Sequence, residues 1–264
     1  MLRPLVLQIF VRLPKLARIS KAETFYSISF LFGFMPDKVK ILVGCPTSDH
    51  KAYCLKEYAE GIKAMEGEFD VLVVDNSQTE EYVAKIVKVG LPAVRGPLTG
   101  AARERIVACR NVLRDKVLNE GYDWFFSLEQ DVIPPPGVLA RLLSAKRKII
   151  TGVYTKEFKK MQDGKLVGRV VRPLLYMIHN GNVAQMEMDD LEPPRVQEVF
   201  SAGLGCMLIH RSVLEKVTFR WDPNFKAFDD MFFSTDAMKQ GFKKYADTSI
   251  RCEHLEMSWE GIEK

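Results

Sequence analysis

Two carboxylates, Glu129 and Asp131, stand two residues apart directly after an aromatic and apolar run at residues 122–128. Such a run is typical of a buried strand, and residues two apart on a strand point to the same side. Paired carboxylates repel each other and are costly to desolvate unless a cation or a hydrogen-bonding ligand offsets their charge. The pair therefore indicates a cation or ligand site at the strand exit, or else a solvated acidic turn ahead of the prolines at 134–136.

Polar residues also follow two earlier apolar runs. Pro46 and Thr47 come after the β-branched run at 39–44, and Asp75 comes after the run at 69–74. In parallel sheets of this kind, ligands bind beyond the carboxyl ends of the strands. We therefore expect the three polar strand exits to form one site.

Alternating strand and helix patterns must position these exits. We predict strands at 39–44, 69–74, 91–97 and 124–128, with helices from Ser48 or Asp49, at 79–89 and at 100–120. Further along, we predict helices at 137–145, 211–217 and 228–240 and strands at 148–154, 200–209 and 244–252. This alternation implies parallel strands with right-handed crossovers. The predicted fold is α/β, a three-layer sandwich around a mainly parallel central sheet with a Rossmann-like N-terminal half.

Two segments have a weaker pattern. Residues 156–197 are less regular, with strand-like pieces at 169–171 and 174–178, and their acidic part at 187–192 is either a solvated loop or a mobile lid. The leader, residues 1–37, has apolar runs too short to span a bilayer. It is predicted to lie on a membrane face or a partner, to pack on the core, or to be poorly ordered. The rest, 38–264, is predicted to be a single domain with halves 38–135 and 136–264.

Composition and missing motifs exclude several classes. The 264 residues carry a net charge of +4 with scattered basic residues, so no nucleic-acid partner is expected. The five cysteines are widely spaced, which favours a reducing cytosol over a disulfide framework or a zinc site. No Gly-x-Gly-x-x-Gly follows the first strand and no Gly-Lys-Ser/Thr loop occurs, which counts against dinucleotide-binding Rossmann domains and P-loop NTPases.

An ordered set of residues resembles the GT-A glycosyltransferases, most closely the family-2-like members of bacteria, archaea and phages. The resemblance covers about residues 39–256 and rests on Asp75, Arg110-Asn111, Glu129-Gln130-Asp131, Gly203-Leu204-Gly205, Asp229-Asp230 and His254. It implies a GT-A-like fold and a metal-dependent transfer of a sugar from a nucleotide-sugar donor, UDP- or GDP-linked, to an acceptor hydroxyl.

The Asp-x-Asp motif of that family corresponds to Glu129-Gln130-Asp131. The resemblance implies that Asp131 binds Mn²⁺ or Mg²⁺ on the diphosphate, with His254 as a further metal ligand. Glu129 would approach the ribose or the sugar, although a glutamate stands where the family has an aspartate.

The resemblance also assigns the remaining residues. Pro46, Thr47 and Asp75 would hold the nucleoside, and Arg110 with Arg103 would face the base or the phosphates. Asp230, or its neighbour Asp229, would be the general base of an inverting reaction.

Structural alternatives remain for several of these residues. Asp229 and Asp230 could cap the helix that follows them, Arg110 could form surface ion pairs on an exposed helix, and His254 could be structural. The acceptor could be a glycan, a lipid-linked molecule or a protein, and the location is expected to be cytoplasmic, free or at the cytoplasmic face of a membrane. The alternative functions are a sugar-phosphate nucleotidyltransferase and an inactive nucleotide- or sugar-binding relative.

Overall fold

The computed structural model describes residues 39–98, 100–225 and 227–256. They belong to one compact unit that begins at Val39. The leader predicted at 1–37 lies outside the described residues. Within these ranges, no helix combines the length and the apolar character that crossing a bilayer would need.

The first half of the unit follows the predicted alternation of strands and helices. Its elements are β1 (Ile41–Thr47), the 3₁₀ helix η1 (Asp49–Cys54), α2 (Leu55–Ala64), β2 (Asp70–Asp75), α3 (Glu81–Lys88), β3 (Ala93–Arg95), α4 (Ala102–Asn119) and β4 (Trp124–Leu128). Strand β1 pairs in parallel with β2 and β4, and β2 pairs in parallel with β3. The carboxyl ends of these four strands therefore meet at one edge of the sheet.

The second half extends the same sheet and adds smaller ones. Its elements are β5 (Val132–Ile133), α5 (Val138–Ser144), β6 (Ile149–Val153), β7 (Thr155–Gln162), β8 (Lys165–Pro173), β9 (Leu175–His179), β10 (Asn182–Gln185), η2 (Met188–Leu191), β11 (Val196–Val199), β12 (Ser201–Ala202), β13 (Cys206–His210), α6 (Arg211–Leu214), α7 (Asp229–Lys239), β14 (Lys244–Arg251) and β15 (Glu253–His254). The main sheet has eight strands in the order β11-β14-β6-β13-β4-β1-β2-β3. Strand β13 runs antiparallel to both β4 and β6, whereas β14 is parallel to β6.

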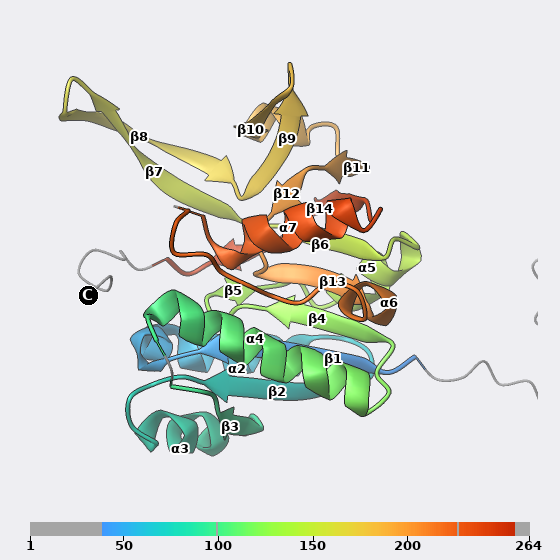
Figure 1. The fold of residues 1–264 in the computed structure, drawn as a ribbon. Coiled ribbons are helices and arrows are strands. Elements are labelled where there is room, and N and C mark those ends of the chain that lie inside the picture. Colours follow the sequence, from blue (N-terminus) through green and yellow to red (C-terminus); the bar gives the residue numbers. More distant parts are fainter. Residues whose placement is uncertain (1–38, 99, 226, 257–264) are drawn as a thin grey trace, which may run out of the picture. The chain divides into compact units, whose positions relative to one another are not determined.

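Helices cover both faces of this sheet, which confirms the predicted three-layer α/β architecture (Figure 1). Successive residues of the central strands belong alternately to two hydrophobic clusters. Leu42 and Phe125 pack with α4, α6 and α7, whereas Val43 and Phe126 pack with α2, α3 and α5. Because successive strand side chains point to opposite faces, the continuous apolar runs of β1 and β4 can bury both faces.

The irregular part predicted at 156–197 contains two hairpins that the sequence analysis missed. Strands β7 and β8 pair as a two-stranded antiparallel sheet of their own, and β9 and β10 form a second hairpin, to which β12 adds. Their loops are Asp163-Gly164 and Asn180-Gly181, and all four residues have φ between 50° and 78°. Asp-Gly and Asn-Gly are the residues that two-residue hairpin loops with positive φ require. The acidic segment expected to be a loop or a lid includes the short helix η2.

The Gly203-Leu204-Gly205 segment makes room for a neighbouring aromatic ring. A Cβ atom on Gly205 would lie 2.7 Å from Cζ of Tyr154, and the Gly205 N–H donates to the Tyr154 hydroxyl at 3.0 Å. The glycines thus allow close approach of the segment to Tyr154, the residue that follows β6.

Candidate functional site

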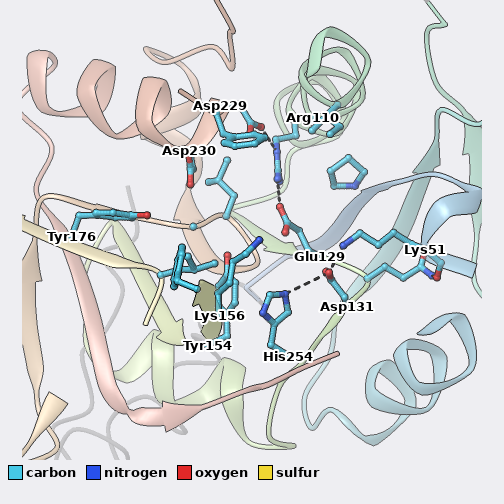
Figure 2. A pocket seen from close by; sticks show the side chains of 18 residues that line it. Lys51, Arg110, Glu129, Asp131, Tyr154, Lys156, Tyr176, Asp229, Asp230 and His254 are labelled. Carbon is cyan, nitrogen blue, oxygen red and sulfur yellow. Dashed lines mark hydrogen bonds and ion pairs between the residues drawn. The ribbon is translucent and has the colours of Figure 1, made fainter. Parts of the chain in front are cut away.

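A cavity of about 290 Å³ opens at the carboxyl edge of the sheet, where the first strands end and α7 begins (Figure 2). Seven of the ten predicted site residues line it: Pro46, Arg110, Glu129, Asp131, Asp229, Asp230 and His254. They come from β1, α4, the loop after β4, the start of α7 and β15. The structure therefore brings together residues that are up to 208 positions apart in the chain.

Arg110 is the centre of the first of two clusters of charged side chains in the cavity. Only 2% of its side chain is exposed, so the alternative of an exposed helix with surface ion pairs is wrong. Its Nε donates to Asp229 Oδ2 at 2.5 Å, its Nη2 donates to Glu129, and its Nη1 donates to the Ser127 hydroxyl at 2.9 Å. Burial opposes the charge, but Asp229 and Glu129 outweigh it and raise the pKa of Arg110 above its ordinary value.

This arrangement separates the roles of the two acids at the start of α7. Asp229 is held in place by its ion pair with the Arg110 guanidinium. Asp230 forms no such pair; its Oδ1 accepts the Met231 N–H at 2.6 Å. Burial, followed by the charges of Asp229 and Glu129, raises the pKa of Asp230 to about 7. A carboxyl with that pKa can exchange protons near neutral pH.

Asp131 is the centre of a second charged group. Its Oδ2 accepts from the Lys51 ammonium and lies 3.4 Å from Nε2 of His254, while its Oδ1 is buried with no hydrogen-bond partner among the described residues. Burial opposes ionisation, but His254 and Lys51 outweigh it and lower the pKa of Asp131 to about 2. The carboxylate is therefore ionised and has one oxygen still to be satisfied.

The chemistry of Asp131 and His254 fits a divalent cation that is shared with a substrate. Nδ1 of His254 lies 2.7 Å from the Thr155 carbonyl oxygen, which can only accept, so this nitrogen carries a proton. Burial opposes protonation of the ring, but Asp131 outweighs it and raises the pKa of His254, and a cation that binds Nε2 would have to displace the proton there. Within the described ranges, no cluster of three or more histidine, cysteine or acidic side chains is placed to hold a metal. A cation here would therefore have two protein ligands and would need its others from a bound ligand, as Mg²⁺ on phosphates does.

Three predicted residues lie outside this cavity. Thr47 donates to Gln130 Oε1 at 2.5 Å, and Asp75 is fully buried, where it accepts from Arg95 Nη1 at 2.7 Å and from Ser77. Thr47 thus holds the Gln130 side chain and Asp75 holds the turn at Ser77 and the Arg95 side chain, and neither residue lines the cavity. The guanidinium of Arg103 lies 4.1 Å from the centre of the Phe228 ring, at the side of the cavity that Phe228 lines.

The opposite wall of the cavity is formed by residues that the sequence patterns did not predict. Lys51, Tyr154, Lys156 and Tyr176 all line the cavity and point toward its interior (Figure 2). Burial raises the pKa of Tyr154 and of Tyr176, so both phenols stay neutral and can donate hydrogen bonds. The wall thus combines two ammonium groups with two phenol rings, a surface suited to phosphates and sugars.

Gln130, the middle residue of the acidic motif, has a structural role. Its Nε2 donates to the Lys51 carbonyl oxygen at 2.6 Å, and its Oε1 accepts from Tyr82 at 3.1 Å as well as from Thr47. Gln130 is 1% exposed, so these bonds tie the acidic loop to η1 and α3. Because η1 carries Lys51, the same bonds help to place its ammonium beside Asp131.

Comparison with known proteins supports the fold. No protein-family model matches the sequence, and no curated protein matches it either. Among solved structures, GalNAc-T7 with UDP, GalNAc and Mn²⁺ matches with a TM-score of 0.56 and 10% identity, over 84% of this chain and 45% of that one. TarS of S. aureus matches with a TM-score of 0.50 and 14% identity, over 84% and 37%. TarS 1–349 in complex with UDP gives the same TM-score and identity, over 84% and 62%.

These likenesses show that the chain has a GT-A-like fold, as the sequence analysis predicts. The chain spans less than two thirds of the length of each of these structures.

Proposed function

We propose that the protein is a glycosyltransferase that moves a sugar from a nucleoside-diphosphate donor to an acceptor hydroxyl. The observation that carries this proposal is the pairing, in one cavity, of an ionised Asp131 with an unsatisfied oxygen and an Asp230 whose pKa is raised to about 7. The first group suits the charged diphosphate with its cation, and the second suits proton removal from a hydroxyl.

The donor would lie at the strand exits. A divalent cation, Mn²⁺ or Mg²⁺, held by Asp131 and His254 would supply positive charge to the diphosphate. Lys51 and Lys156 line the same cavity and add positive charge from the side chains themselves. Charge that builds up on the departing nucleoside diphosphate would be stabilised by these ammonium groups.

The acceptor hydroxyl would be activated by Asp230. Its carboxylate takes the hydroxyl proton while the oxygen attacks the anomeric carbon of the sugar and the nucleoside diphosphate leaves. Attack from the side opposite the leaving group inverts the anomeric configuration. Asp229 and Glu129 remain fixed by Arg110, so we assign them to shaping the site and not to proton transfer.

Two further points favour a uridine nucleotide. GalNAc-T7 was solved with UDP, GalNAc and Mn²⁺, and TarS 1–349 was solved with UDP, and both share the fold of this chain. UDP-sugars are therefore the first donors to test, with GDP-sugars as the second class.

A thermal-shift screen of nucleoside diphosphates, with and without Mn²⁺, tests the donor class. Binding to the folded state raises stability by about 2.7 kcal/mol when the ligand is at 100 times its Kd, which moves the melting temperature by several degrees. We expect one nucleoside diphosphate to stabilise the chain in the presence of Mn²⁺. Asp131→Asn should lose this effect, whereas Asp163→Asn, at an exposed turn, should keep it.

The alternative functions predict other results. Stabilisation by a nucleoside triphosphate, with release of pyrophosphate on addition of a sugar phosphate, would indicate a nucleotidyltransferase. Metal-dependent nucleotide binding without turnover of any donor would indicate an inactive relative.

A further inference from the structure

The β7–β8 hairpin concentrates the positive charge of the chain. Residues 155–173 contain six lysines and arginines against two acids, a net charge of +4 that equals the net charge of all 264 residues. Three of the six form ion pairs within the described residues: Lys156 with Glu256, Arg169 with Glu157 and Arg172 with Glu187. These pairs are at least partly exposed and therefore weak, so the hairpin presents a positive potential to the solvent.

Exposed apolar side chains lie beside this charge at the far end of the hairpin. Met161 pairs with Leu166 across the strands, and their side chains are 56% and 52% exposed; Val167 beside them is 51% exposed. Lys160 and Lys165 flank these residues on both strands. The tip is thus an apolar patch bordered by ammonium groups.

The hairpin is also poorly supported by the rest of the unit. It forms a separate two-stranded sheet and extends away from the main sheet (Figure 1). Among the described residues, none from 155–173 belongs to either hydrophobic cluster of the core. A two-stranded hairpin without a packed face is only marginally stable in water, so a surface that covers its apolar tip would stabilise it.

We propose that the β7–β8 hairpin docks on an anionic membrane surface, with Met161, Leu166 and Val167 at the acyl boundary and the lysines among the headgroups. Apolar tips bordered by basic residues bind such surfaces through buried apolar area together with attraction to anionic lipids. A second copy of this hairpin is a poor partner, because two surfaces of the same sign repel each other. A polynucleotide would satisfy the lysines but would leave the aliphatic tip uncovered.

Docking in this way places the cavity near the membrane. The base of the hairpin contributes Lys156 and Phe158 to the cavity that contains Asp131 and Asp230. The docking surface and the site are thus joined through a single pair of strands. The proposal does not depend on which reaction the cavity performs.

Sedimentation of the whole chain with lipid vesicles tests the electrostatic contribution to the proposed membrane binding. Wild-type protein should sediment with phosphatidylcholine vesicles that contain phosphatidylglycerol, and much less with phosphatidylcholine alone or at high salt. The double variant Lys160→Glu with Lys165→Glu should bind the anionic vesicles roughly tenfold or more weakly, since each basic residue near such a surface adds about a fivefold factor. The matched control, Lys85→Glu with Lys88→Glu on α3, makes the same charge change away from the hairpin and should bind like wild type.

A second pair of variants tests the apolar part. Met161→Ser with Leu166→Ser should weaken vesicle binding by about three- to tenfold. The control, Val87→Ser with Met238→Ser, changes side chains that are 53% and 49% exposed on α3 and α7 and should have no effect.

Four results would overturn the proposal. Wild-type chain that ignores anionic vesicles, or hairpin variants that bind them as wild type does, would remove the hairpin from any membrane contact. Vesicle binding that depends on the lysines but not on Met161 and Leu166 would contradict the placement of the apolar tip at the acyl boundary and would leave only an unspecific charge attraction. A wild-type dimer that the hairpin variants convert to a monomer would indicate a second copy of the chain. Since nucleotide binding is measured without vesicles, none of these outcomes bears on the proposed reaction.

Discussion

The ammonium of Lys51 contacts Oδ2 of Asp131, the oxygen that also faces Nε2 of His254. A protein cation thus lies against the carboxylate that we assign to a metal ion. A metal that binds Asp131 has to share this oxygen with Lys51 or use the unsatisfied Oδ1.

Replacing Lys51 by Met should therefore strengthen the response to metal. We expect Mn²⁺ alone to raise the melting temperature of Lys51→Met by more than that of wild type, because no ammonium competes for the carboxylate. Without metal, the variant should lose about 1–3 kcal/mol of stability, since a buried carboxylate loses a partner. Lys85→Met, at an exposed site on α3, provides the control. Equal Mn²⁺ responses in wild type and Lys51→Met would contradict this account.

Asp230 should make both stability and activity depend on pH. Its folded-state pKa of about 7 lies above the ordinary value of 3.8, so its contribution to stability is present below pH 4 and is lost as the pH rises through 7. Asp230→Asn removes this loss and should be more stable than wild type at pH 8 by about 1–3 kcal/mol, with little difference at pH 4.

Burial is the largest cause of the raised pKa of Asp230, and the charges of Asp229 beside it and Glu129 after β4 add to it, whereas the Met231 N–H and Arg110 on α4 oppose it. Urea unfolding at several pH values measures the difference between Asp230→Asn and wild type. Wild-type kcat/KM should rise through pH 7 as the base loses its proton. A stability difference that is the same at pH 4 and pH 8 would show that the carboxyl of Asp230 is not perturbed.

The Arg110 pairs should be far more important for stability than exposed pairs. Arg110→Met leaves the carboxylates of Glu129 and Asp229 beside each other without a counter-charge, and we expect a loss of about 3–5 kcal/mol. Arg169→Met removes an exposed pair with Glu157 and should cost less than about 1 kcal/mol. Urea midpoints of the two variants provide the comparison, and similar midpoints would refute the assignment of Arg110 as a buried bridge.

The close packing of Gly205 against Tyr154, a residue that lines the cavity, can be tested by substitution. Gly205→Ala would place a Cβ 2.7 Å from the Tyr154 ring and 2.9 Å from Val132, and we expect a loss of about 1–3 kcal/mol. Gly168→Ala on β8 meets no atom within 4 Å and should be nearly neutral. Thermal unfolding of both variants measures this, and an unaffected Gly205→Ala would mean that Tyr154 can move away at little cost.

Local sequence patterns were sufficient for the fold and for the acids at the strand exits. The apolar runs marked β1 and β4, and the alternation of strands with helices implied their parallel direction; Pro46 lies at the end of β1 and Asp131 in the loop after β4. Arg110 was found only through a resemblance, and its burial could not be predicted. That burial depends on α4 converging with Glu129 and Asp229 from two other elements.

The residues that were missed gave weaker signals. Lys51 lies on a short 3₁₀ helix, and lysine after a strand is usually a solvated residue. Strand β7 reads Thr-Lys-Glu-Phe-Lys-Lys-Met-Gln, without the alternation of a half-buried strand, because both of its faces are largely exposed. The Asp163-Gly164 pair between β7 and β8 was the available hairpin signal.

The central claim is tested most directly by turnover of nucleotide sugars. Wild-type chain is incubated with UDP- and GDP-sugars and Mn²⁺, and mass spectrometry follows the nucleoside diphosphate and the sugar product. We expect release of a nucleoside diphosphate from one donor class, lost on chelation and reduced by a factor of at least about 10² in Asp131→Asn and in Asp230→Asn. Asp163→Asn should react like wild type. Turnover in Asp131→Asn at the wild-type rate, with metal and donor present, would contradict the account.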